Sequence, residues 1–135
     1  MNGNSILLDS DVIILASKRE IDVERLLTTY DKLYVSVISY MEVYGFVFED
    51  GEEKHLVDKL FTDIEIVYAD KSIADIAIIY RKNSAKKIKL PDAVILATAR
   101  YLETGFLTNN LSDFQGVDPV VTISGVEGLS RIEKG

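Results

Sequence analysis

Residues 5–17 read SILLDSDVIILAS, and this stretch decides the class of the fold. Its first part, residues 5–9, is a short apolar run that ends in an acid, which predicts a buried strand. A helix through VIILAS follows directly, with Asp11 as a candidate cap. A strand joined at once to a helix is the first half of a βα unit, so the segment predicts an α/β protein.

The same alternation of short apolar runs and helical spacing continues along the chain. Pro91 opens a helix that runs through DAVILATARYLE, and Gly105 is expected to stop it. Parallel strands joined by helices require right-handed crossovers. We therefore predict one domain over residues 1–135, with a mostly parallel sheet covered by helices on both faces. The further strands are predicted at residues 33–37, 64–68, 106–108 and 120–123.

Composition restricts the classes of function. The 135 residues carry a net charge of −7, whereas proteins that hold nucleic acid by non-specific attraction are normally basic. If the protein acts on phosphate, a bound metal ion must reverse the local charge. The chain has no cysteine and one histidine, His55, which excludes thiol catalysis and a multi-histidine metal site. We find no signal peptide and no run long enough to span a membrane, so we expect a cytoplasmic protein.

Four acids are predicted to meet at one edge of the sheet. Asp9 closes the first strand, and Glu42 and Asp113 follow later strands. Asp92 opens the helix that starts at Pro91. In folds of this kind, ligands bind beyond the carboxyl ends of the strands, so the four side chains would share a cleft. Because crowded carboxylates repel one another and have raised pKa values, the cleft favours a hard divalent cation such as Mg²⁺ or Mn²⁺.

Each acid also has a purely structural interpretation. Ser39 and Glu42 have the spacing of a capping box, and Asp92 suits the first turn of a helix. Asp9 and Asp11 are both candidate caps for the first helix, and we assign Asp11 mainly to capping. The shared cation site is favoured because an acid at the end of a buried strand is costly without a counter-ion.

Four sequence blocks, spread over residues 7–114, carry a resemblance to a known family: LLDSDVII, SYMEVYGF, LPDAVILATA and LTNNLSDF. In their order and spacing they resemble PIN-domain ribonucleases, and most of all the small VapC-type toxins of toxin–antitoxin pairs. The resemblance implies a three-layer α/β/α fold with about five parallel strands, one or two Mg²⁺ or Mn²⁺ ions, and endonucleolytic cleavage of RNA. It also implies a cognate antitoxin as partner and a homodimer.

The resemblance also assigns roles to individual residues. Thr108 matches a position that hydrogen-bonds near the metal, and Asn110 is expected to assist Asp113. Ser10 and Asp11 fall where the family usually has Thr and Asn, a departure that leaves the first acid unchanged. The residues that it assigns to both catalysis and metal binding are Asp9, Glu42, Asp92 and Asp113.

One basic block stands out in this acidic chain. Residues 81–89 read RKNSAKKIK and immediately precede the helix that carries Asp92. The block is a candidate contact for the RNA backbone, and a solvated surface loop is an equally weighted alternative. Its bases are Arg81, Lys82, Lys86, Lys87 and Lys89.

Two other functions stay open at this stage. The run ILLDSD mimics the strand-end D-x-D of haloacid-dehalogenase-like phosphatases. Those enzymes also need a later lysine and a Ser or Thr at strand ends, where this chain carries acids. The second alternative is a catalytically silent PIN-like binding module, which the intact set of acids disfavours.

Overall fold

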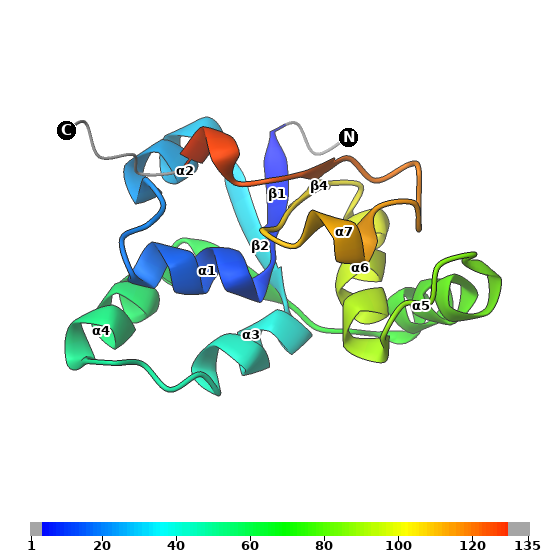
Figure 1. The fold of residues 1–135 in the computed structure, drawn as a ribbon, viewed down its shortest axis with the longest axis horizontal. Helices are drawn as coiled ribbons and strands as arrows, with labels where there is room; N and C mark the ends of the chain where they lie inside the picture. The colour runs from blue at the N-terminus through cyan, green and yellow to red at the C-terminus, as the bar shows by residue number, and fades with distance from the viewer. Residues whose placement is uncertain (1–3, 130–135) are drawn as a thin grey trace.

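Strands and helices alternate along the chain in the computed structural model, which describes residues 4–129 (Figure 1). The strands are β1 (Ser5–Leu8), β2 (Lys32–Ser36), β3 (Ile64–Val67), β4 (Gly105–Leu107) and β5 (Ile123–Ser124). The helices are α1 (Ser10–Ser17), α2 (Val23–Thr29), α3 (Val37–Tyr44), α4 (Gly51–Leu60), α5 (Lys71–Asn83), α6 (Leu90–Leu102) and α7 (Leu111–Phe114). A short 3₁₀ helix, η1 (Glu127–Leu129), follows the last strand.

The five strands form one parallel sheet in the order β3-β2-β1-β4-β5. The strand β1 is central, and Leu8 at its end pairs with Val35 on one side and Leu107 on the other. The residue after Leu8 therefore emerges in the middle of the carboxyl edge of the sheet. This topology confirms the predicted α/β fold with five parallel strands.

Helices cover both faces of the sheet. On β1, Ile6 and Leu8 join the apolar core under α1, α2 and α4, whereas Leu7 joins the core under α5 and α6. Figure 1 shows these two groups of helices on opposite sides of the strands. Because β1 is buried on both faces, its sequence is a continuous apolar run instead of an alternating one. The three-layer α/β/α prediction is confirmed.

Two predicted helix starts are wrong. The N-cap of α1 is Asp9, whose Oδ1 accepts the backbone N–H of Ser10 at 2.8 Å, so Asp11 is not the cap. The N-cap of α3 is Ser36, whose hydroxyl accepts from the N–H of Ile38, so Ser39 does not begin a capping box. In both cases the helix starts directly at the end of the preceding strand, earlier than the local sequence indicates.

The end of α6 also differs from the prediction. Glu103, not Gly105, adopts the left-handed conformation that terminates this helix, with φ of 56°. Gly105 instead begins β4, where an added Cβ would lie 3.0 Å from the Ile6 side chain. Within residues 4–129, the helices are all too short or too polar to cross a lipid bilayer.

Candidate active site

Asp9 lies at the centre of the carboxyl edge of the sheet. Its backbone N–H donates to the carbonyl of Leu107 at 2.9 Å, which continues the pairing of β1 with β4 by one residue. The residue is only 7% exposed. Oδ1 accepts from the N–H of Ser10 at 2.8 Å, and Oδ2 accepts from the Thr108 hydroxyl at 2.7 Å. Both carboxylate oxygens are thus held by neutral donors, which fix the orientation without neutralising the charge.

The environment of Asp9 disfavours its charged form. Burial is the largest cause and raises the pKa of Asp9 to about 7, with the charges of Asp11 and Glu42 adding to the effect. The hydrogen bonds from Thr108 and Ser10 oppose this shift but do not overcome it. At neutral pH the buried carboxylate therefore favours either a proton or a cation beside it.

Ser10 connects Asp9 to Glu42. Glu42 lies on the exposed surface of α3, and its Oε1 accepts the Ser10 hydroxyl at 2.9 Å. The backbone N–H of Ser10 is the donor to Asp9, so one residue holds both acids. Ser10, which falls where the resembling family usually has Thr, is expected from the sequence to be a supporting residue of the site, and that role stays a prediction.

The loop between β4 and α7 connects Asp9 to Asp113. Thr108 is fully buried, and its hydroxyl donates to Asp9 while accepting the N–H of Asn110 at 2.9 Å. The side-chain amide of Asn110 in turn donates to Asp113 Oδ2 at 2.6 Å. A continuous hydrogen-bonded chain, here called the acid chain, therefore runs through the following residues in order: Glu42, Ser10, Asp9, Thr108, Asn110 and Asp113.

Asp92 lies near the same edge, in the first turn of α6 after Pro91. Burial raises the pKa of the half-buried Asp92 carboxyl, and the charges of Asp113 and Glu42 raise it further. Lys89, the N-cap residue of α6, acts in the opposite direction. The charge of Glu42 thus acts on the pKa of both Asp9 and Asp92, and that of Asp113 on the pKa of Asp92, which links the four sequence-predicted acids.

Asp11 is a fifth acid of this edge, and the sequence analysis assigned it mainly to capping. Its Oδ1 accepts the backbone N–H of Asn109 at 3.3 Å, a contact across 98 residues of sequence. Burial raises its pKa, and the nearby charges of Glu42 and Asp113 add to the shift. The one sequence signal that Asp11 belongs to this group of acids is its position, where the resembling family usually has Asn.

The donor chemistry of this edge suits a hard divalent cation. Carboxylate oxygens are the preferred ligands of Mg²⁺ and Mn²⁺, and the five acids form no salt bridge within the part of the chain that the structure describes. As the side chains lie, however, no three His, Asp or Glu among residues 4–129 converge closely enough to hold an ion. Glu42 and Asp113 are exposed and are the two with most freedom to turn inward.

The basic block spans the end of α5 and the connection to α6. Arg81 and Lys82 lie in the last turn of α5, and Lys89 is the residue before α6. The effect of Lys89 on the pKa of Asp92 links this end of the block to the acidic edge. For Lys86 and Lys87, no contact connects the side chain to the acids among the described residues.

Comparison with known proteins supports the fold and the family. Residues 6–118 match a family model described as PIN domain. No match was found among curated proteins. A chain of a toxin–antitoxin complex from Klebsiella pneumoniae is 27% identical, with a TM-score of 0.66 over 87% of this chain and 95% of that chain.

Two further solved structures share the fold at lower sequence identity. A chain of DNA-bound VapBC from Salmonella typhimurium is 22% identical, with a TM-score of 0.76 over 90% of this chain and 98% of that one. A chain of VapBC2 from Rickettsia felis, bound to a promoter DNA fragment, is 17% identical, with a TM-score of 0.73 and the same coverage of 90% and 98%.

Proposed function

The chain belongs to the PIN domain family, and from this premise we propose that it is a Mg²⁺- or Mn²⁺-dependent endoribonuclease, the VapC-type toxin of a toxin–antitoxin pair. The observation that carries the proposal is the acid chain, in which neutral hydroxyl and amide donors hold Asp9, Glu42 and Asp113 beside one another. Such an arrangement keeps negative charge available to a cation. A purely structural cluster would be stabilised by lysine or arginine.

In the proposed site, Asp9, Asp92 and Asp113 bind the metal directly, and Glu42 binds it directly or through water. When bound, Mg²⁺ or Mn²⁺ lowers the pKa of a water molecule and stabilises the charge that develops on the scissile phosphate. Thr108 and Ser10 hold the Asp9 carboxylate in a fixed orientation, so the side chain loses little conformational entropy when the cation binds. Because the pKa of Asp9 is about 7, cation binding near neutral pH displaces a proton from its carboxyl.

The basic block is proposed to bind the RNA backbone on the α6 side of the acids. Lys89 is the member whose charge reaches Asp92, so it would contact phosphate nearest the site of cleavage. Arg81 and Lys82, in the last turn of α5, would extend the contact to further phosphates of the RNA strand. A local basic strip of this kind offsets the net charge of −7, which otherwise repels RNA.

The proposal is tested by incubating a structured RNA with the protein and Mg²⁺ or Mn²⁺, with EDTA as a parallel reaction. We expect metal-dependent cleavage that leaves 5′-phosphate and 3′-hydroxyl ends, and its loss in Asp9→Asn. The matched control is Asp75→Asn, which removes an exposed acid on α5 that pairs with Lys71. RNA binding without cleavage would indicate the silent binding module, and turnover of a phosphomonoester in place of RNA would indicate a phosphatase.

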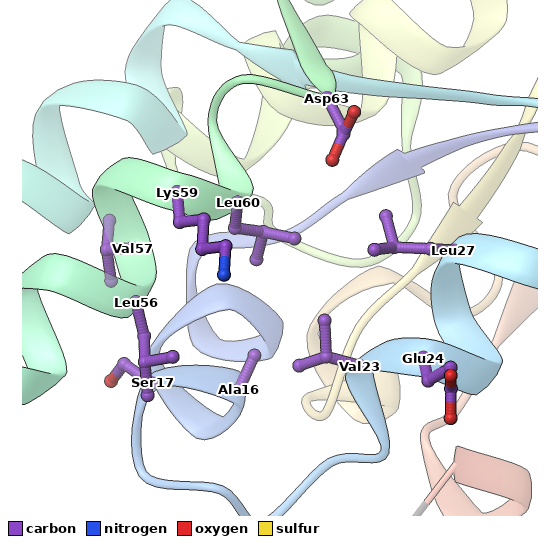
Figure 2. Close-up of a pocket in the computed structure, with 10 residues that line it drawn as sticks. All are labelled: Ala16, Ser17, Val23, Glu24, Leu27, Leu56, Val57, Lys59, Leu60 and Asp63. Carbon is purple, nitrogen blue, oxygen red and sulfur yellow. The ribbon is translucent and has the colours of Figure 1, made fainter.

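An apolar cavity supports the proposed antitoxin partner. A space of about 310 Å³ lies between α1, α2 and α4. In Figure 2, Val23 and Leu27 from α2 face Leu56 and Leu60 from α4 across this space, with Ala16 of α1 between them. We propose that an apolar segment of the cognate antitoxin occupies it, because antitoxin complexes are among the solved structures similar to this chain.

This partner is tested by identifying a short reading frame beside the gene and co-expressing its product with the protein. Leu27→Asp places a charge in the cavity and is expected to abolish co-purification, whereas Val47→Asp, at a position that is 87% exposed, is expected to retain it. Equal co-purification of both variants would exclude the cavity as the binding site. Homodimerisation stays a separate prediction, which light scattering on the purified chain tests.

A further inference from the structure

Asp11 has no role in the proposed reaction, although it contacts the loop that carries two of the supporting residues. The contact joins Asp11 Oδ1 on α1 to the backbone N–H of Asn109, at 3.3 Å. Asn109 is exposed, and its backbone N–H is the group that contacts α1. The contact lies at the protein surface, between the half-buried Asp11 and the exposed Asn109.

The loop depends on such contacts because it leaves the sheet at this point. The N–H of Thr108 still donates to the carbonyl of Ser124 as part of the sheet, at 3.0 Å. The next two N–H groups have side-chain acceptors instead: Asn109 donates to Asp11, and Asn110 donates to the Thr108 hydroxyl. The Asp11 contact therefore fixes Asn109, which lies between Thr108 and Asn110.

We propose that Asp11 is a positioning residue, which tethers Asn109 to α1 and so places Thr108 and Asp113 for cation binding. The inference rests on the proposed metal-dependent function. It assigns the effect to an acceptor oxygen and not to the negative charge, because a backbone N–H requires only an acceptor. An asparagine at position 11 offers an amide oxygen at the same distance along the side chain and would serve equally.

The test compares Asp11→Ala with Asp11→Asn, using calorimetric titration with Mn²⁺ and amide hydrogen exchange at Asn109. Loss of the tether in Asp11→Ala should weaken Mn²⁺ binding by about 10- to 100-fold, as loss of groups that orient metal ligands typically does. Asp11→Asn should stay within about threefold of the unsubstituted protein and keep the Asn109 amide protected. Asp75→Ala, which removes an exposed acid on α5, is the control for loss of a charge. Asp11→Ser replaces Asp11→Ala if the latter does not fold.

Three results would overturn the inference. If Asp11→Ala changes neither the Mn²⁺ affinity nor the hydrogen exchange rate at Asn109, Asp11 does not tether the loop. If Asp11→Asn binds Mn²⁺ as weakly as Asp11→Ala does, the negative charge of Asp11, and not its acceptor oxygen, supports Mn²⁺ binding. Unchanged exchange at Asn109 with weakened Mn²⁺ binding would make Asp11 a ligand and not a positioning residue. If the unsubstituted protein binds no Mn²⁺, the proposed function fails, and the exchange measurement still decides whether the tether exists.

Discussion

The hydroxyl of Thr108 donates to Asp9 Oδ2 at 2.7 Å, although the two residues are 99 positions apart in the sequence. The parallel pairing of β1 with β4 produces this contact, because Leu8 and Leu107 are register partners and each is followed by one of the two residues. Both side chains are buried, so water does not compete for the bond. The orientation of the central acid is therefore set by the sheet itself.

Replacing Thr108 by valine should weaken both the fold and metal binding. The substitution keeps the side-chain shape but removes the donor to Asp9 and the acceptor for the Asn110 N–H. We expect a loss of about 1–3 kcal/mol in the free energy of unfolding and a 10- to 100-fold loss of Mn²⁺ affinity. Thr108→Ser retains the hydroxyl and should recover most of the affinity. Denaturant unfolding and calorimetry measure the two effects, and equal affinity in the valine and serine variants would contradict the role of the hydroxyl.

Asp9→Asn should make the stability of the metal-free protein less dependent on pH between pH 4 and 8. Because the pKa is raised from 3.8 to about 7, the carboxyl is protonated in both the folded and unfolded states below pH 3.8 and has no net effect there. Between pH 3.8 and pH 7 the carboxyl ionises in the unfolded state before it does in the folded state, so the free energy of unfolding falls as the pH rises. For a pKa shift of about three units, the loss reaches about 4 kcal/mol above pH 7. The amide removes this loss. Unfolding in EDTA across pH 4 to 8 should show that the unfolding free energy of Asp9→Asn rises relative to that of the unsubstituted protein as the pH rises. A difference between the two proteins that is independent of pH would contradict this prediction.

Mg²⁺ or Mn²⁺ should raise the melting temperature of the unsubstituted protein and leave that of Asp9→Asn unchanged. Binding to the folded state alone adds about 2.7 kcal/mol when the free ion is at about 100 times its dissociation constant. Scanning fluorimetry with and without EDTA measures the shift, and NaCl of matched ionic strength controls for screening. An equal shift in both proteins would place the cation elsewhere.

Lys89→Ala should weaken RNA binding more than the loss of a distant lysine does. We expect a higher KM with little change in kcat, and a salt dependence of binding to single-stranded RNA that is shallower by about 0.7 in log–log slope for one lost phosphate contact. Lys71→Ala is the matched control, because Lys71 pairs with Asp75 at the opposite end of α5 from the basic block. Identical salt-dependence slopes for the two variants would show that Lys89 does not contact an RNA phosphate.

Asp118 provides a stability control that is separate from the acids of the site. This buried carboxylate accepts from the Tyr80 hydroxyl at 2.5 Å, from Arg100 at 2.8 Å and from the N–H of Val120 at 3.0 Å. Burial acts to raise its pKa, but these hydrogen bonds outweigh burial and hold the pKa below its ordinary value. The stability they contribute is therefore present above the ordinary pKa and is lost as the pH falls below it.

Asp118→Ala should accordingly lower the free energy of unfolding at pH 7 by about 2–4 kcal/mol, because Tyr80 and Arg100 lose their partner. The Mn²⁺ affinity of the folded protein should not change. Denaturant unfolding and calorimetry on the same variant check both statements. A large loss of Mn²⁺ affinity in this variant would show that general loosening of the fold, and not the local donors, explains the effects at Thr108.

The fold was largely predictable because its signals are local. The run that forms β1 and the spacing that forms α6 each indicate one structure, and the order of such elements fixes a parallel sheet. The gathering of Asp9 and Glu42 also followed from topology, since residues after parallel strands meet at one edge. The assignment of these acids to catalysis and metal binding stays a proposal, for which cation binding and RNA cleavage are the tests.

The two wrong helix starts share one physical cause. Ser36 and Ser39 are both suitable caps, as are Asp9 and Asp11, and local sequence does not distinguish between members of such pairs. The choice is made by where the preceding strand ends, because the first free side chain there becomes the cap. The contact of Asp11 with Asn109 was equally beyond sequence reasoning, since it depends on the neighbouring position of β1 and β4 in the sheet.

The most direct test of the central claim is an anomalous difference map from crystals of the protein soaked in Mn²⁺. The account predicts a strong peak at the carboxyl edge of the sheet, coordinated by Asp9 and by at least one of Asp92 and Asp113, and no such peak in Asp9→Asn crystals. A map in which this edge holds no metal at saturating Mn²⁺ would contradict the claim that these carboxylates form a divalent cation site.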